Sequence, residues 1–278
     1  MYAERLGLQL VDTATTTTFA RCEVISLNPF VPRRGEEPIG DSGVEALASG
    51  LFRCHRLRRL DLSFSSISAD GLGVLLKALK HTRHLEALIL DGNPLIGDDG
   101  AKLIGRLLQR RHSHSNLKFI SLRQCGITAV GALELTESFN NPHVRRLDLG
   151  RNDLGTTGAL ILAEAMVDRG GAFGRVSYLG LESNGIGATG ATALAEAMAM
   201  ATSRPRRRRS NRRGQQPAPA KSPQLSAEGQ LPCVLDLEHN DVDRLGNATS
   251  LANVPVTGNC DIRLSGNPIT NRLLHPQP

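Results

Sequence analysis

Apolar and polar positions recur along this chain in one order, beginning near residue 22. Five segments that start at residues 57, 85, 117, 144 and 176 each open with an apolar residue, two variable residues and an apolar-x-Leu unit. The spacings between these starts are 28, 32, 27 and 32 residues. Because alternate side chains of a strand face opposite ways, each unit predicts a short strand with an inward pair. The predicted inward pairs are Leu60 and Leu62, Leu88 and Leu90, Leu147 and Leu149, and Leu179 and Leu181.

A helical pattern follows each predicted strand. After Gly71, for example, Leu72, Leu75 and Leu79 recur at i, i+3 and i+7, which predicts one apolar stripe on a helix. The same pattern follows Gly43, Gly100, Gly131, Gly158 and Gly190. Polar residues just before these runs are predicted to be helix N-caps. They are Asp41, Asp98 and Thr156.

One polar column accompanies the leucines where each strand ends. It reads Asn93, Asn152, Asn184, Asn240 and Asn267, with Ser65 and Cys125 in the same position of two other repeats. A buried Asn amide both donates and accepts, so it can satisfy backbone groups where the chain turns off a strand.

Together these columns resemble leucine-rich repeats of the ribonuclease-inhibitor type. A single strand-plus-helix unit cannot bury its apolar face, but stacked units can. The resemblance implies an α/β solenoid, a horseshoe with about eight parallel inner strands, outer helices and a ladder of stacked Asn side chains. We divide the chain into an N-terminal extension (1–21), six repeats (22–200), an insert (201–230), and two degenerate repeats with a tail (231–278).

The insert interrupts the repeats and carries the excess charge. Residues 201–230 contain four Pro, seven Arg and one Lys against Glu228, a net of +7, which leaves −1 for the rest of the chain. Composition therefore gives no sign of a basic face on the folded body. A repeat start at 232 would lie 56 residues after 176, so either one repeat has decayed or a loop was inserted. The insert arginines are Arg204, Arg206, Arg207, Arg208, Arg209, Arg212 and Arg213.

Three interpretations of the insert stay open. Its composition cannot bury enough surface to offset ordering entropy, so we expect a loop that is disordered or ordered by a partner. It is a solvated loop, an electrostatic tether to RNA or an acidic protein, or a nuclear localisation signal.

The side chains between the inward leucines are expected on the open, concave face, where solenoids bind partners. Acids dominate two of the columns, and two of the chain's nine aromatic residues fall on this face. Such a face suits a basic or amphipathic protein segment; alternatively, its mixed charges only keep it soluble, with Arg59 and Arg146 paired to neighbouring acids. The candidate residues are Arg59, Asp61, Asp91, Phe119, Arg123, Arg146, Asp148, Tyr178, Glu182, Asp236 and Glu238.

Catalytic and metal-binding motifs are missing from the sequence. His112 and His114 have no third ligand nearby, and the Gly-rich segment 97–105 lacks the Gly-Lys-Ser/Thr ending of a phosphate loop. We expect no cofactor, no metal, no small-molecule substrate and no membrane span. Five scattered Cys suit a reducing compartment, so we expect the cytoplasm, with the mitochondrial matrix and the nucleus as alternatives.

These features predict a non-enzymatic protein-interaction scaffold, or a structural subunit of a larger assembly. Ribonuclease inhibitors are rich in Cys and Trp and strongly acidic, whereas this chain has no Trp and a net charge of +6, so inhibition of a ribonuclease is not expected. The alternatives are a GTPase-activating protein of the Ran activator kind and an RNA-contacting subunit of a ribonucleoprotein such as a mitochondrial ribosome.

Overall fold

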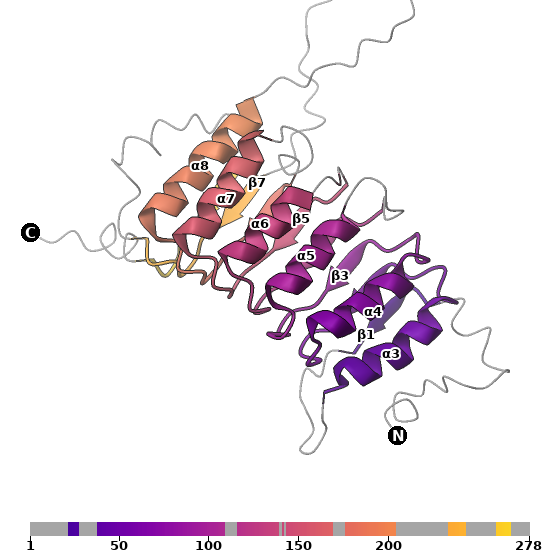
Figure 1. The fold of residues 1–278 in the computed structure, drawn as a ribbon. Helices are drawn as coiled ribbons and strands as arrows, with labels where there is room; N and C mark the ends of the chain where they lie inside the picture. Colours follow the sequence, from indigo (N-terminus) through magenta and orange to yellow (C-terminus); the bar gives the residue numbers. More distant parts are fainter. Residues whose placement is uncertain are drawn as a thin grey trace, which may run out of the picture.

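Eight strands form one parallel sheet in which each strand pairs with the next one in the sequence (Figure 1). The computed structural model describes residues 22–27, 38–108, 116–138, 141, 143–168, 176–203, 233–242 and 260–267. The strands are β1 (Val24–Ser26), β2 (Arg59–Asp61), β3 (Ala87–Ile89), β4 (Phe119–Ser121), β5 (Arg146–Asp148), β6 (Tyr178–Gly180), β7 (Cys233–Asp236) and β8 (Cys260–Arg263).

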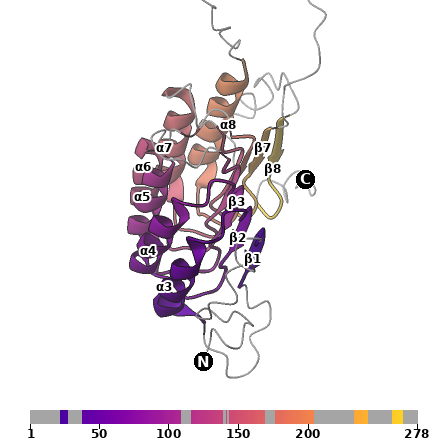
Figure 2. The same ribbon diagram turned by 90° about the vertical axis from the view of Figure 1, so that its right-hand side faces the viewer.

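The helices within the described residues lie in a second layer against one face of this sheet, and the other face stays uncovered by them (Figure 2). The two layers confirm the predicted solenoid with inner strands and outer helices. The helices are α3 (Gly40–Leu51), α4 (Ala69–Leu79), α5 (Gly97–Leu107), α6 (Ala129–Ser138), α7 (Gly155–Asp168) and α8 (Gly187–Ser203).

One continuous core runs between the layers. Its members extend from Ile25 on β1 to Val242 after β7, and the four predicted Leu pairs are buried in it. Leu60, Leu88, Ile120 and Leu147 pair in register on the neighbouring strands β2 to β5, so their side chains stack along the solenoid. The Leu positions that recur along the sequence thus all face one shared core.

The Asn column forms the predicted ladder. The Asn93 amide oxygen accepts the N–H groups of Ser65 and Ile67 at 3.1 and 3.0 Å, and its amide nitrogen donates to the carbonyls of Leu62 and Leu90. Each Asn therefore satisfies backbone groups of its own repeat and of the one before it. Asn152, Asn184, Asn240 and Asn267 make equivalent bonds.

The predicted N-cap role of Asp41, Asp98 and Thr156 is wrong. Each lies in the first turn of its helix, and its side chain reaches the next repeat. Asp98 accepts the N–H of Thr128 at 2.8 Å and its hydroxyl at 2.7 Å, and Asp41 accepts the same two groups of Ser68. Thr156 donates to a backbone carbonyl of the next repeat. Ser68 itself caps α4, so these side chains tie successive helix starts together.

The helix glycines lie inside the first turns of the helices. They permit close packing between helices: a Cβ on Gly190 would lie 2.7 Å from the Cβ of Ala159 on the preceding helix. Gly131 is equally close-packed, with Asp98 in the space a side chain would need.

The predicted insert lies in the connection between α8 and β7. Because β6 pairs directly with β7, no strand of an additional repeat lies between them. The inserted-loop alternative therefore fits the topology, and α8 continues to Ser203, beyond the predicted boundary at 200. The N-terminal extension 1–21, the insert from 204 onward with its arginines, and the tail after 267 lie outside the described residues.

Candidate protein-binding face

The uncovered face of the sheet carries the predicted candidate residues in register. One column runs Arg59, Ala87, Phe119, Arg146, Tyr178, Val234 and Asp261, and the next runs Asp61, Ile89, Ser121, Asp148, Gly180, Asp236 and Arg263. Most strands are three residues long, and the residues of each column occupy the same position on successive strands. Their outward side chains are therefore neighbours across the sheet. This register brings together residues that lie 27 to 32 positions apart in the sequence, and 56 apart where the insert intervenes between β6 and β7.

Arg146 stacks between two aromatic rings instead of pairing with an acid. Its guanidinium carbon lies 5.3 Å from the ring centroid of Phe119 on β4 and 4.8 Å from that of Tyr178 on β6. A cation held over ring faces is attracted by their quadrupoles. Arg59, in contrast, pairs with Asp61 at 3.3 Å, as one alternative reading expected.

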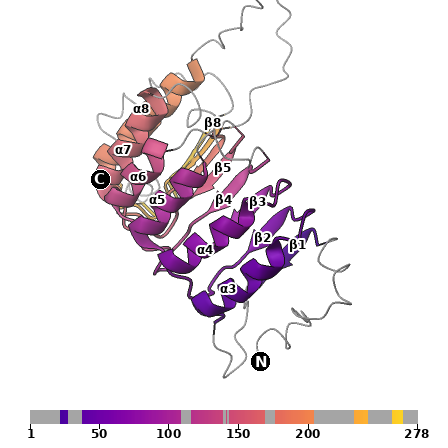
Figure 3. The ribbon, with the colours of Figure 1, turned by 45° about the vertical axis from the view of Figure 1, so that its right-hand side comes forward.

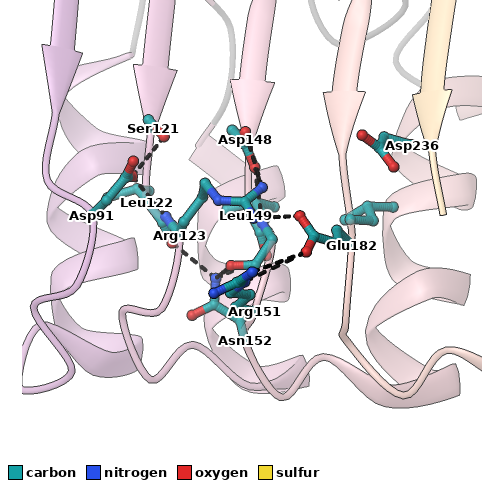
Figure 4. Close-up of polar contacts among 12 residues, drawn as sticks. Asp91, Ser121, Leu122, Arg123, Asp148, Leu149, Arg151, Asn152, Glu182 and Asp236 are labelled. Carbon is teal, nitrogen blue, oxygen red and sulfur yellow. Dashed lines mark hydrogen bonds and ion pairs between the residues drawn. The ribbon is translucent and has the colours of Figure 1, made fainter. Parts of the chain in front are cut away.

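Arg123 crosses the face and connects three strands (Figure 4). Its Nη1 lies 3.2 Å from Oδ1 of Asp148, and its Nη2 bonds Glu182, which follows β6. Gly150 leaves the room for this crossing, because a Cβ there would lie 2.5 Å from Arg123 Nη1. Arg151 also reaches Glu182, at 3.4 Å.

The pKa shifts in this cluster follow from burial and pairing. Burial opposes the charged form of Arg123, but its hydrogen bond to Glu182 and the nearby Asp148 charge outweigh burial and raise the pKa of Arg123. Burial likewise opposes the charged form of Glu182, but the Arg123 hydrogen bond lowers the pKa of that carboxyl. For Asp91, burial raises the pKa, although the Ser121 hydroxyl donates to the carboxylate at 2.6 Å.

Three of the acids predicted on the open face accept hydrogen bonds from backbone N–H groups. Asp61, Asp148 and Asp236 are only 7 to 8% exposed, and each accepts the N–H of the residue two positions later. Asp and Asn side chains commonly bond their own backbone two residues on in this way. The acidic character of the face is therefore partly structural, which the sequence count of acids could not reveal.

Tyr178 links the stacked arginine to the neighbouring strand. Its hydroxyl donates to Oδ2 of Asp236 at 3.4 Å. Burial, and then the charges of Asp148 and Asp236, raise the pKa of Tyr178 to about 12. The hydroxyl therefore stays a donor at neutral pH.

The structure thus groups most of the predicted residues into two contacts. The first is the stack of Phe119, Arg146 and Tyr178, and the second is the ion-pair cluster centred on Arg123. Arg151, Gly150 and the exposed Val24 on β1, which is 57% exposed, were missed by the sequence reasoning. For Val24 the signal was available, since it aligns with Arg59 in the first column.

Within the described ranges, no set of three His, Cys, Asp or Glu side chains is arranged to hold a metal ion. A search of the same residues finds no helix with the length and apolar content of a membrane span.

Comparisons with known proteins find leucine-rich repeats in this chain. A family model described as "Leucine Rich repeat" matches residues 81–105, 140–163 and 176–195. The human protein "NACHT, LRR and PYD domains-containing protein 14" is 32% identical over 59% of this chain and 15% of its own length. Pig "Ribonuclease inhibitor" is 32% identical over 48% of this chain and 29% of its own length.

An internalin of Listeria monocytogenes covers 62% of this chain and 58% of its own, with 13% identity and a TM-score of 0.27. The chain spans less than a third of the two sequence relatives named above. The fold and the repeats define a leucine-rich-repeat protein, a class typical of protein-binding scaffolds. Its repeats are of the ribonuclease-inhibitor type.

Proposed function

We propose that this chain is a non-enzymatic scaffold that binds a partner protein on its concave face. The observation that carries the proposal is the stack of Arg146 between Phe119 and Tyr178. These side chains lie on the open face, outside the leucine core, and a rigid aromatic–arginine unit is typical of binding hot spots. The half-buried rings offer apolar contact beside acids, which suits an amphipathic segment with basic side chains.

A matched pair of variants tests this. The double variant Phe119→Ala/Tyr178→Ala removes both rings, and the control Val130→Ala/Leu160→Ala shortens two exposed apolar side chains on α6 and α7. Each is used as bait in affinity purification with nuclease present, with the melting temperature confirming the fold. Loss of a defined protein set from the face variant alone supports the proposal; retention of that set by the face variant overturns it.

A GTPase activator would behave differently in a second measurement. Purified chain added at catalytic amounts to a Ran-type GTPase loaded with GTP is expected to leave hydrolysis at its basal rate. Stimulation of hydrolysis would replace the scaffold proposal with the regulatory one.

The insert is a separate part of the proposal. We propose that Arg204 to Arg213 act as an electrostatic tether to a polyanion, because clustered Arg neutralise phosphates whatever the base sequence. Deletion of 201–230 is expected to weaken cosedimentation with RNA at low salt and to leave protein partners of the concave face in place. Unchanged cosedimentation would remove the tether.

A further inference from the structure

The connections that lead from each helix to the next strand lie along one edge of the solenoid, because all strands run parallel (Figure 3). We define the return edge as their described residues: 52–58, 80–86, 108, 116–118, 141, 143–145 and 176–177. The return edge holds seven basic residues and a single acid, Glu86, a net of +6. The basic residues are Arg53, Arg56, Arg58, Lys80, Arg83, Lys118 and Arg145.

The opposite edge does not share this charge. Its connections from strand to helix, residues 62–68, 90–96, 122–128, 149–154 and 181–186, hold two Arg against three acids, a net of −1. The balanced charge of the whole body therefore conceals a basic edge, contrary to the expectation from composition. The topology separates the charges, since successive loops alternate between the two edges.

Only part of the positive charge on the return edge is paired with an acid. Arg53, Arg56 and Arg83 are exposed and form no ion pair with any residue that the structure describes. Glu86 is shared between Arg58 at 2.8 Å and Lys118 at 2.9 Å, so one negative charge stands against two positive ones. An excess of positive charge remains along the edge.

Part of this charge is arranged in a row. Arg58, Glu86, Lys118 and Arg145 hold the same register position before β2 to β5, because the backbone N–H of each bonds the carbonyl of the residue at that position in the repeat before, at 2.7 to 2.9 Å. Glu23 holds this position before β1, so three basic residues stand against two acids along β1 to β5. Neighbouring strands are about 4.8 Å apart, so the row spans about 14 Å. A linear polyanion fits such a row better than a compact anion.

Aromatic surface accompanies the charge. Phe52 is 48% exposed and lies beside His81 of the next loop, with ring centroids 5.0 Å apart. Bases of single strands stack on exposed aromatic rings, while their phosphates follow basic grooves. An acidic protein would use the cations but has no need of the rings.

We propose that the return edge binds single-stranded nucleic acid. Phe52 and His81 stack a base, and Arg53, Arg56 and Arg83 neutralise the adjoining phosphates. This surface is distinct from the concave face, so the proposal holds or fails independently of the scaffold function.

The test measures binding of a fluorescent 20-nucleotide oligouridylate by anisotropy at several salt concentrations, with the full chain. The variant Arg53→Gln/Arg56→Gln/Arg83→Gln is compared with Lys77→Gln/Lys102→Gln/Arg106→Gln, which removes equal charge from the outer helices α4 and α5. Three lost phosphate contacts predict a salt slope shallower by about 2 and at least tenfold weaker binding at low salt. The control is expected to stay within about threefold. Equal weakening by both variants would mean that net charge alone acts and would overturn the site.

Two further probes separate nucleic acid from other polyanions. Phe52→Leu is expected to weaken oligouridylate binding about fivefold or more and to leave heparin binding unchanged, because stacking is lost while charge is kept. Binding of a polyglutamate peptide as tight as that of oligouridylate, insensitive to Phe52→Leu, would assign the edge to acidic proteins and refute the proposal. A chain with the seven insert arginines changed to Ala shows the contribution of the insert separately.

Discussion

The two edges of this solenoid perform different physical tasks. At the edge where strands end, buried Asn amides bond backbone groups of two repeats, and charges are few and largely paired. At the return edge, the apolar side chains are buried in the core, and the charged side chains are mostly exposed and mostly basic. The comparison teaches that stacking is specified at one edge, which leaves the other free to acquire binding residues.

The largest expected loss of stability comes from breaking the Asn ladder at the edge where the strands end, which we call the structural edge. Asn93→Ala leaves two N–H groups and two carbonyls without their buried partner, so we expect a loss of about 3 kcal/mol or more in the free energy of unfolding. Urea unfolding followed by circular dichroism measures it. Asn116→Ala at the return edge is the matched control. The exposed Asn116 amide nitrogen donates to the backbone carbonyl of Arg83, and its loss is expected to cost about 0.5 kcal/mol or less. Similar losses of unfolding free energy in both variants would contradict the proposed difference between the two edges.

A glycine of the structural edge is the next most sensitive point. Gly126 has φ +71° and lies so close to its neighbour that an added Cβ would be 2.5 Å from the carbonyl oxygen of Pro94. Gly126→Ala is therefore expected to cost about 1–3 kcal/mol. Gly73→Ala in α4, where the nearest atom would be at 3.7 Å, is expected to stabilise by about 0.5–1 kcal/mol. Thermal unfolding of both variants checks the opposite signs, and a stabilised Gly126→Ala would contradict the assignment.

Glu182 and Glu86, one at each edge, are expected to differ in how their contribution to stability depends on pH. Glu182 is half-buried and its folded pKa is lowered, so it contributes stability above its unfolded pKa of about 4.3, and this contribution is lost as pH falls through the folded pKa. Glu182→Gln is expected to cost about 1 kcal/mol at pH 7 and progressively less toward pH 3. Glu86 also has a lowered pKa, but its side chain is 33% exposed and its partners Arg58 and Lys118 are exposed, so solvent screens both pairs. Glu86→Gln is expected to leave the unfolding midpoint unchanged at both pH values; a pH-independent cost at Glu182 would argue against the Arg123 pair.

The repeat columns were predictable because each reflects a demand that every repeat meets. The positions of Leu60 and Asn93 recur in successive repeats at near-equal spacings, since one interior and one ladder run through all repeats. The stack around Arg146 was not predictable, because neighbouring acids and neighbouring rings both lay within its reach. Asp148 looked like a surface charge but bonds its own backbone, a local choice that composition does not reveal. The basic edge escaped notice because the loops that form it are separated in the sequence by near-neutral strands and helices.

The smallest expected effect concerns the stability of the return edge itself. Arg53→Gln/Arg56→Gln/Arg83→Gln removes three exposed charges that form no ion pair with the described residues, so the free energy of unfolding is expected to change by about 0.5 kcal/mol or less. Like charges on one edge repel, and salt screens them over a Debye length of about 10 Å at 0.1 M. Wild-type chain should therefore melt at a slightly higher temperature in 300 mM than in 20 mM NaCl, and the variant should show less of this rise. A clear destabilisation of the variant at both salt concentrations would mean that these arginines help to hold the repeats together, and the two edges would then no longer differ in kind.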